Sequence, residues 1–239
     1  MCLISIIIPS FNCVGLLQGA IDDALAQTHG SKQVIVVDGA STDGSVEMLK
    51  AYHQRIDWIS EPDSGVYDAM NKGIQMARGD WLYFLGTDDR FYEPDVLAKV
   101  AALIDEHPAR VLVGDVLDES GGIFRSRMDW RTVAINTVHH QSAFYHRSLF
   151  EFFRYDTAIR VISDYELNFL CWLRGTPSRK IDLVVARCAS TGLSHTTSEL
   201  RNYRDAFTLR KRHISSPLNY VALAISLANL GRRTLLQRS

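Results

Sequence analysis

Cysteine is scarce in this chain, and its four cysteines, at positions 2, 13, 171 and 188, form no recognisable pattern. No two of them make a C-x-x-C pair, and none has the spacing of a zinc site. A reducing compartment would leave them as free thiols, so small buried apolar side chains are the favoured interpretation. The sequence therefore predicts neither a disulfide framework nor a zinc module.

Long apolar runs are missing too. The first twelve residues contain only a short one, without a basic start or a small-residue cleavage site, so we expect no secretory signal and a cytoplasmic protein. Residues 214–231 carry no charge, but polar side chains interrupt them at Ser216, Asn219, Ser226 and Asn229. Because a membrane span needs about 20 predominantly apolar residues, an interfacial helix is the better interpretation of this segment.

Glycine-rich phosphate loops are also absent. Residues 9–12 read Pro-Ser-Phe-Asn where a dinucleotide-binding dehydrogenase has G-x-G-x-x-G, and no Walker loop occurs. The basic, glycine-rich loop that usually begins a nucleotidyltransferase is missing as well. These absences disfavour a dinucleotide-binding dehydrogenase, an enzyme with a Walker phosphate loop and a nucleotidyltransferase.

Charge is present in balanced amounts but is unevenly distributed. Residues 201–239 hold eight Lys or Arg against one acid, a net charge of +7, which leaves −8 for residues 1–200. We therefore expect one domain over residues 1–200 and a basic, helical C-terminal extension over residues 201–239. Basic clusters flank the uncharged segment and favour peripheral contact with an anionic membrane; packing of the helix on the domain or on a dimer partner is the alternative.

Short apolar runs alternate with helical patterns along the first half of the chain. The expected strands are residues 3–9, 33–38, 58–60, 80–85 and 111–116, and the expected helices are residues 14–27, 46–54, 67–77 and 95–106. This order predicts an α/β fold with an open, mostly parallel sheet and helices on both faces. Ligands of such sheets bind beyond the carboxyl ends of the strands.

Acidic residues stand at several of these strand ends. The carboxylate of Asp38 can accept a hydrogen bond from a nucleotide base, or it can simply cap its own turn. Asp88 and Asp89 follow a core strand, where burying two like charges is costly unless a cation binds them. Mg²⁺ or Mn²⁺ would suit these oxygens and can bridge a diphosphate, whereas a solvated turn is the alternative.

Five stretches occur together in the order of a known family: residues 5–12, 36–45, 61–73, 77–80 and 85–89. They resemble the inverting glycosyltransferases of family 2, which have the GT-A fold. The likeness is greatest to bacterial enzymes that build O-antigen, colanic acid or similar surface polysaccharides, and it is strong over residues 3–95 and looser over about 135–170. It implies a Rossmann-like GT-A domain with a donor half over about residues 1–115 and an acceptor half over about 116–200.

The resemblance also implies a nucleotide-diphosphate sugar donor, with UDP as the expected nucleotide, and a divalent cation, Mn²⁺ or Mg²⁺. The donor-binding residues that it implies are Pro9, Ser10, Phe11, Asn12, Asp38, Asp63, Asp68, Asn71, Lys72 and Asp88. Asp88 and Asp89 stand in the family's metal-binding D-x-D element, although Gly86 replaces the first acid of the commoner form.

Residues 161–167 resemble the family's Glu-Asp-x-Asp-Leu element near the start of a helix, with Ser163 in place of the leading Glu. This likeness implies that Asp164 is the base that removes the proton of the acceptor hydroxyl. Capping of the helix by Ser163 and Asp164 is the alternative, and the two roles can coexist.

Two further segments contain histidine. His140 and Gln141 are candidates for the acceptor site or for a late metal ligand, against a structural role for the pair. His195 could close over the diphosphate, or it could lie on the surface.

We expect an enzyme that transfers a sugar to a hydroxyl of a glycan or lipid-linked glycan, with no nucleic-acid partner. A non-catalytic subunit that binds nucleotide sugar or scaffolds polysaccharide assembly is the rival.

Overall fold

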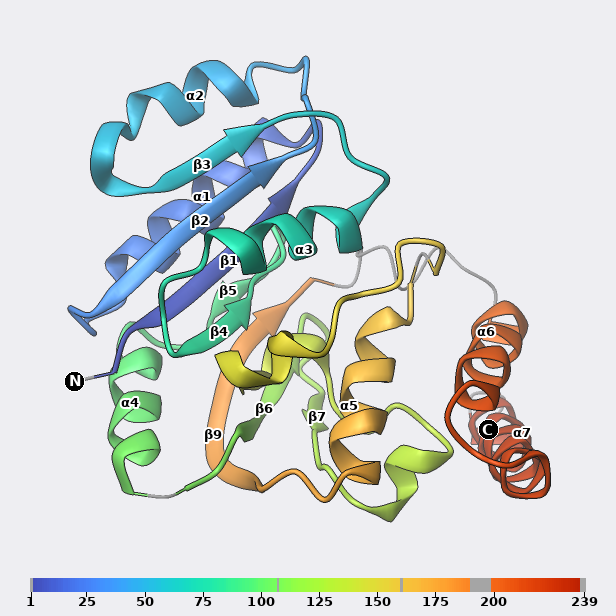
Figure 1. Ribbon diagram of the computed structural model, residues 1–239. Helices are drawn as coiled ribbons and strands as arrows, with labels where there is room; N and C mark the ends of the chain where they lie inside the picture. Colours follow the sequence, from blue (N-terminus) through green and yellow to red (C-terminus); the bar gives the residue numbers. More distant parts are fainter. Residues whose placement is uncertain (1, 107, 160, 190–198, 237–239) are drawn as a thin grey trace.

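A computed structural model describes residues 2–106, 108–159, 161–189 and 199–236, and these form a mixed sheet flanked by helices (Figure 1). The order of the neighbouring strands is β3-β2-β1-β4-β8-β6-β9-β5, with β7 paired to β6. The N-terminal half of the sheet is parallel, and the C-terminal half is mixed.

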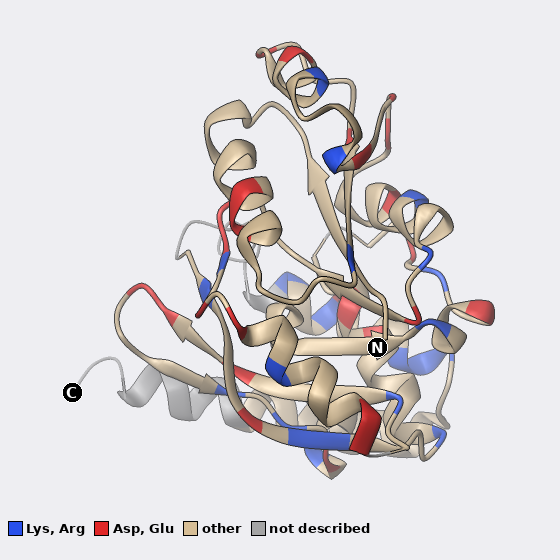
Figure 2. Cartoon of the chain, turned by 90° about the vertical axis from the view of Figure 1, so that its left-hand side faces the viewer, with Lys and Arg blue, Asp and Glu red and all other residues tan. Residues whose placement is uncertain are grey.

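The parallel half contains β1 (Ile4–Ser10), β2 (Lys32–Asp38), β3 (Asp57–Ser60) and β4 (Trp81–Phe84). Strands β1 and β4 carry no charged residue and are tan in Figure 2. Their continuous apolar character fits strands that are buried on both faces. The predicted strands of this half are confirmed to within two residues at each end.

Two layers of helices cover the sheet, and the side chains of β1 alternate between them. Ile6 and Ile8 pack in the cluster formed with α1 (Val14–Ala26), α2 (Ser45–Ala51) and α4 (Val96–Glu106). Ile7 packs in the opposite cluster, with α3 (Val66–Met76) and α5 (Ser163–Leu173). This alternation is the strand period of two, and it produces the predicted α/β layers.

The second half departs from simple parallel order. Strand β8 (Ala143–His146) inserts between β4 and β6 (Val111–Asp118) and is antiparallel to both. The other elements of this half are β5 (Arg90–Phe91), β7 (Ile123–Arg125), β9 (Ser178–Cys188) and the short 3-10 helices η2 (Trp130–Val133), η3 (His140–Ser142) and η4 (Arg147–Glu151), whereas the 3-10 helix η1 (His53–Arg55) precedes β3 in the parallel half. The predicted strand at residues 111–116 is therefore correct, but it does not pair directly with β4.

The C-terminal extension forms two helices beside α5, namely α6 (Glu199–Lys211) and α7 (Ser216–Leu236) (Figure 1). Leu209 of α6 joins a small core cluster with Ile159, Tyr165 and Phe169. Among the residues that the structure describes, no helix is long and apolar enough to cross a membrane.

The orientation of α7 is unusual for an amphipathic helix. Its polar residues Asn219 and Ser226 are fully buried. Apolar residues of the same helix are exposed, namely Leu218, Tyr220, Val221, Ile225 and Leu227. A surface helix normally turns its apolar stripe toward the core, so α7 presents its stripe outward.

Candidate functional site

A cleft of about 780 Å³ opens beyond the carboxyl ends of β1 and β4, between the first turns of α3 and α5. This volume is in the range of small-molecule sites. The cleft brings together nine of the residues singled out from the sequence: Pro9, Ser10, Phe11, Asp63, Asp88, Asp89, His140, Gln141 and Asp164. They come from the segment expected to form a donor half, about residues 1–115, and from the segment expected to form an acceptor half, about residues 116–200; this division stays a prediction.

Phe11 and Asp63 face this cleft at the end of the parallel half of the sheet. Phe11 is 61% exposed, which is high for an aromatic residue directly after a core strand. An exposed ring at a strand end can stack on the planar face of a ligand. Asp63 accepts a hydrogen bond from the backbone N–H of Gly65 at 2.9 Å, which fixes the turn before α3.

Asp38 is fully buried at the end of β2, and hydrogen bonds occupy both of its carboxylate oxygens. Oδ2 accepts from the backbone N–H of Ser41 at 2.9 Å and from Ser60 Oγ at 2.7 Å, while Oδ1 accepts from Ser41 Oγ at 2.5 Å. This is the turn-capping arrangement that the sequence allowed. Binding of a nucleotide base by Asp38 stays a prediction.

Four other predicted donor-site residues do not line the cleft but brace the loops around it. Asn12 accepts from the backbone N–H of Thr42 at 2.9 Å, and Asp68 accepts from that of Ser64 at 3.0 Å. Asn71 makes two hydrogen bonds to the backbone of Tyr155, and Lys72 pairs with Glu61 at 2.9 Å and donates to Pro62 O at 2.8 Å. These four side chains, from the stretches 5–12 and 61–73, thus fix backbone positions in this structure. Direct contact with a donor stays a prediction for all four.

Asp88 and Asp89 differ in their surroundings although they are adjacent. Asp88 is partly exposed in the cleft, whereas Asp89 is 5% exposed and accepts a hydrogen bond from the backbone N–H of Ala189 at 3.2 Å. Burial, with the charge of Asp88 as a smaller contribution, raises the pKa of Asp89 to about 6. Burial and the nearby Asp89 raise the pKa of the Cys188 thiol, so this thiol stays protonated beside the carboxylate. Among the described residues neither carboxylate forms a salt bridge, and the adjacent Arg90 lowers the pKa of Asp89 only as a minor contribution, so the pair favours binding of a cation.

The two carboxylates fit part of a Mg²⁺ or Mn²⁺ site. Within the described part of the chain, no group of three or more His, Cys, Asp or Glu side chains could hold a metal ion. Mg²⁺ is commonly bound by one or two carboxylates together with substrate phosphates and water. Asp88 and Asp89 could therefore hold such an ion together with a diphosphate rather than alone.

The absence of a side chain at Gly86 leaves room for the carboxylates of Asp88 and Asp89. A Cβ atom at position 86 would lie 2.4 Å from Asp89 Oδ2 and 3.0 Å from Asp88 Oδ1. The first distance is too short for a carbon atom and the second is tight, so the acid of the commoner family form cannot stand here while Asp89 keeps its position.

Asp164 lies in the first turn of α5 and is 8% exposed. Its two oxygens accept hydrogen bonds from different elements: Oδ1 from the hydroxyl of Tyr67 at 3.0 Å, and Oδ2 from Nδ2 of Asn136 at 3.3 Å. The helix has no side-chain cap at Ile162, so capping does not account for Asp164. A carboxylate held from both sides at the wall of a cleft is a candidate for a general base, and this role stays a prediction for Asp164.

His140 lies on the same side of the cleft, stacked on Phe84 with ring centroids 5.2 Å apart. The residue is partly exposed, but both of its ring nitrogens are shielded from solvent and have no hydrogen-bond partner among the described residues. Burial lowers the pKa of His140, and the charge of Asp164 acts in the opposite direction. The neutral ring thus has one donor and one acceptor that no described residue uses. Gln141 lines the cleft as well, and its backbone carbonyl accepts from the Tyr83 hydroxyl at 2.8 Å.

Two residues that contact Asp164 were not predicted from the sequence. Tyr67 stands inside the motif of residues 61–73, and its place between two acids was the available signal. Asn136 belongs to no recognisable pattern, and only the fold brings it to Asp164. His195, which the sequence offered as a loop residue over the diphosphate, lies outside the described residues.

Known proteins resemble this chain in sequence and in fold. The family model described as glycosyl transferase family 2 matches residues 5–166, more than half of the chain. A PGL/p-HBAD biosynthesis glycosyltransferase of Mycobacterium bovis is 39% identical over 179 residues, covering 70% of this chain and 69% of the relative. An uncharacterized glycosyltransferase of Mycobacterium tuberculosis is 37% identical over 175 residues, covering 70% of this chain and 63% of that protein.

Solved structures show the same fold at low sequence identity. S. aureus TarS 1–349 in complex with UDP-GlcNAc has a TM-score of 0.75 at 17% identity, with 94% of this chain and 71% of that chain covered. The match spans 43% of a longer TarS chain. The mannosyltransferase PcManGT from Pyrobaculum calidifontis, in complex with GDP-Man and Mn²⁺, has a TM-score of 0.69 at 18% identity, with 98% and 75% covered. The GT-A fold predicted from the sequence is confirmed, and the chain belongs to glycosyl transferase family 2.

Proposed function

We propose that this glycosyltransferase moves a sugar from a nucleoside-diphosphate donor, UDP-linked by expectation, to a hydroxyl group of a glycan or lipid-linked glycan, with inversion at the anomeric carbon. The observation that carries the proposal is a single cleft that joins the Asp88–Asp89 pair to the doubly hydrogen-bonded Asp164. The UDP-GlcNAc and GDP-Man complexes of structural neighbours support a nucleotide-sugar donor. Assembly of a bacterial surface glycan is the proposed setting.

Each part of the cleft has a role in this reaction. Residues 9–11 and Asp63 would receive the nucleotide at the ends of the parallel strands. Asp88 and Asp89 would hold a divalent cation, which supplies positive charge against the diphosphate as it leaves.

Asp164 would accept the proton of the acceptor hydroxyl while that oxygen bonds to the anomeric carbon from the face opposite the leaving group. The bond between the anomeric carbon and the diphosphate oxygen breaks, and the nucleoside diphosphate takes its electron pair. Tyr67 would help to hold the carboxylate in place. Burial, and then the charge of Asp164, raise the pKa of Tyr67 well above its ordinary value, so the hydroxyl keeps its proton.

His140 would contact the sugar or the acceptor through its ring. Its nitrogens are the buried polar atoms of the cleft wall that have no partner among the described residues, and a sugar hydroxyl can both donate to and accept from such a ring. Pairing on binding would remove the cost of leaving these atoms unsatisfied.

Peripheral contact with an anionic membrane is a further part of the proposal. The exposed stripe of α7 offers aliphatic surface. In α6, the helix that precedes α7, the side chains of Arg201 and Arg204 are 55% and 78% exposed. Aliphatic burial at the lipid interface and attraction of basic residues to anionic headgroups act in the same direction. An acceptor carried on a lipid would make this contact useful.

The experiment that tests the proposed function is a comparison of Asp164→Asn with the wild type. Release of nucleoside diphosphate would be measured with UDP-, GDP- and dTDP-sugars and a lipid-linked glycan fraction, and nucleotide affinity would be measured separately by calorimetry. We expect the variant to bind nucleotide normally and to lose turnover. Full turnover in the variant would reject Asp164 as the base, and absence of turnover in the wild type with all donors would favour the non-catalytic subunit.

A further inference from the structure

We propose that Arg210 of the C-terminal extension is a positioning residue for Asp164, and that the extension is thereby part of the active site's support. This inference rests on the proposed function, in which Asp164 is the base. It is carried by hydrogen bonds that connect α6 and α7 to the first turn of α5.

The guanidinium of Arg210 is fully buried between the extension and the domain. Nη1 donates to Ala134 O at 2.8 Å and to the hydroxyl of Tyr165 at 3.3 Å, and Nε donates to Asn219 Oδ1 at 3.1 Å. All three acceptors are neutral, and Nη2 has no partner among the described residues. An apolar side chain would fill this space without the cost of burying a charge, so packing alone does not account for arginine.

The two residues that follow α6 are connected to the same part of α5, Arg212 through Asp156 and His213 directly. Arg212 pairs with Asp156 at 2.6 Å, and the backbone N–H of Asp156 donates to Ser163 Oγ at 2.8 Å. His213 Nε2 lies 2.6 Å from Oε1 of Glu166. Together with the bond from Arg210 to Tyr165, these contacts reach positions 163, 165 and 166, which flank Asp164 on its helical turn.

A second path leads from the extension to the carboxylate itself. Ala134 O accepts from Arg210 Nη1 and also from Ser226 Oγ of α7 at 2.5 Å. Two residues further along, Asn136 donates to Asp164 Oδ2. The extension therefore holds both the backbone that carries Asp164 and the segment that supplies one of its two hydrogen-bond donors.

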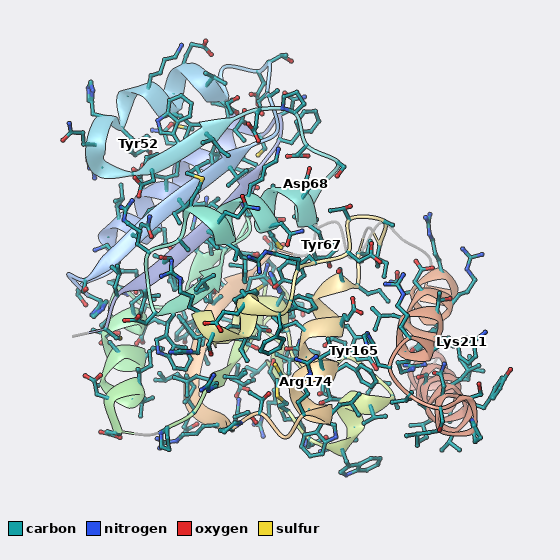
Figure 3. The ribbon with its side chains drawn as sticks, viewed as in Figure 1. Tyr52, Tyr67, Asp68, Tyr165, Arg174 and Lys211 are labelled. Atoms are coloured by element: carbon teal, nitrogen blue, oxygen red, sulfur yellow. The ribbon has the colours of Figure 1, made fainter. Side chains whose placement is uncertain are left out.

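Figure 3 shows the contrast between the two sides of α6. Tyr165 lies on α5 toward α6, whereas Lys211 points away from the domain. Lys211 is exposed. Arg210 and Lys211 are thus adjacent basic residues of which one supports the turn of the base and the other does not.

The test compares Arg210→Met, Arg210→Lys and Tyr165→Phe with Lys211→Met as the matched control. For Arg210→Met and Tyr165→Phe we expect kcat to fall about tenfold, because small displacements of a reacting group are costly, with donor KM and calorimetric nucleotide affinity unchanged. Arg210→Lys keeps one charge-assisted donor and should recover part of kcat, and Lys211→Met should match the wild type. If Arg210→Met does not fold, Tyr165→Phe carries the test, because it keeps the buried ring.

Melting temperature and a double-mutant cycle separate positioning from a structural role. A lower melting temperature with unchanged kcat per folded molecule would overturn the proposal. In an Asp164→Asn background, Tyr165→Phe should cause no further loss of residual turnover, and an additive loss would also overturn it. Wild-type turnover in Asp164→Asn alone would instead reject the proposed base, whatever the result at position 165.

Discussion

The hydroxyl of Tyr67 lies 3.0 Å from Oδ1 of Asp164 and 2.7 Å from the carbonyl oxygen of Val161. One phenol thus connects the first turn of α3, which carries the donor-side motif, to the first turn of α5, which carries the proposed base. This contact is one of those that join the segment expected to bind the donor to the segment expected to bind the acceptor.

Tyr67→Phe should therefore lower kcat while the protein still folds and binds nucleotide. Loss of a hydrogen bond to a charged carboxylate would lower kcat roughly ten- to a hundredfold, with nucleotide affinity retained. Steady-state kinetics and calorimetry would measure the two effects. The matched control is Tyr52→Phe, since the hydroxyl of this buried tyrosine also donates to a carboxylate, Asp22, at 2.9 Å, but on α1 and away from the cleft (Figure 3). Equal losses of kcat in the two variants would contradict the role of Tyr67.

Position 86 should not tolerate the acid that the commoner family form has there. Gly86→Asp, and Gly86→Ala as the smaller change, would push against Asp89 Oδ2 and displace the pair of carboxylates. We expect both variants to weaken metal-dependent nucleotide binding by about tenfold or more, measured by calorimetry. Gly30→Ala is the control, because a Cβ atom there has no neighbour within 4 Å. Improved metal-dependent binding in Gly86→Asp would show that the loop rearranges freely.

Asp89 should make stability depend on pH in the absence of a divalent cation. Its pKa in the folded protein is about 6, above the ordinary value of 3.8, so the folded state holds this proton more tightly than the unfolded state. The resulting stability is present below pH 4 and is lost as the pH rises through about 6. The free energy of unfolding of Asp89→Asn should consequently exceed that of the wild type by about 1–3 kcal/mol at pH 7.5 and by little at pH 4. Denaturant unfolding at both pH values would measure this, and an equal difference at both would refute the assignment.

Exposed apolar residues of α7 should govern binding to lipid. Replacing Leu218 and Val221, which are 46% and 56% exposed, by Gln removes exposed aliphatic surface and leaves the buried contacts of Asn219 and Ser226 in place. We expect the double variant to lose sedimentation with anionic vesicles while its melting temperature is unchanged. Ile123→Gln, which removes an exposed apolar side chain from β7, should bind vesicles like the wild type. Vesicle binding that survives in the double variant would leave α7 to a protein partner.

Much of this fold could be predicted from local pattern. Apolar runs such as residues 3–9 and 33–38 identify strands that are buried on both faces, and the acids that follow residues 33–37 and 80–85 locate the edge of the sheet where the cleft opens. Strand β8 could not be placed in this way, because its four residues follow an irregular segment and its position depends on long-range pairing with β4 and β6.

The site shows a similar division. The motifs identified Asp88, Asp89 and Asp164 as site residues. They did not show which other polar motif residues would hydrogen-bond to the backbone and not line the cleft. Asn71 is an example, since its amide is taken by Tyr155. Asn136 and Arg210 act through partners far away in the chain, and no local signal announces such partners.

The most direct test of the central claim is calorimetric titration of the wild type and of Asp88→Asn with UDP, GDP and dTDP, each with and without Mn²⁺. The account predicts that one nucleotide binds the wild type in a Mn²⁺-dependent manner and that Asp88→Asn loses this dependence. Absence of nucleotide binding by the wild type, or equal Mn²⁺ dependence in the variant, would contradict it.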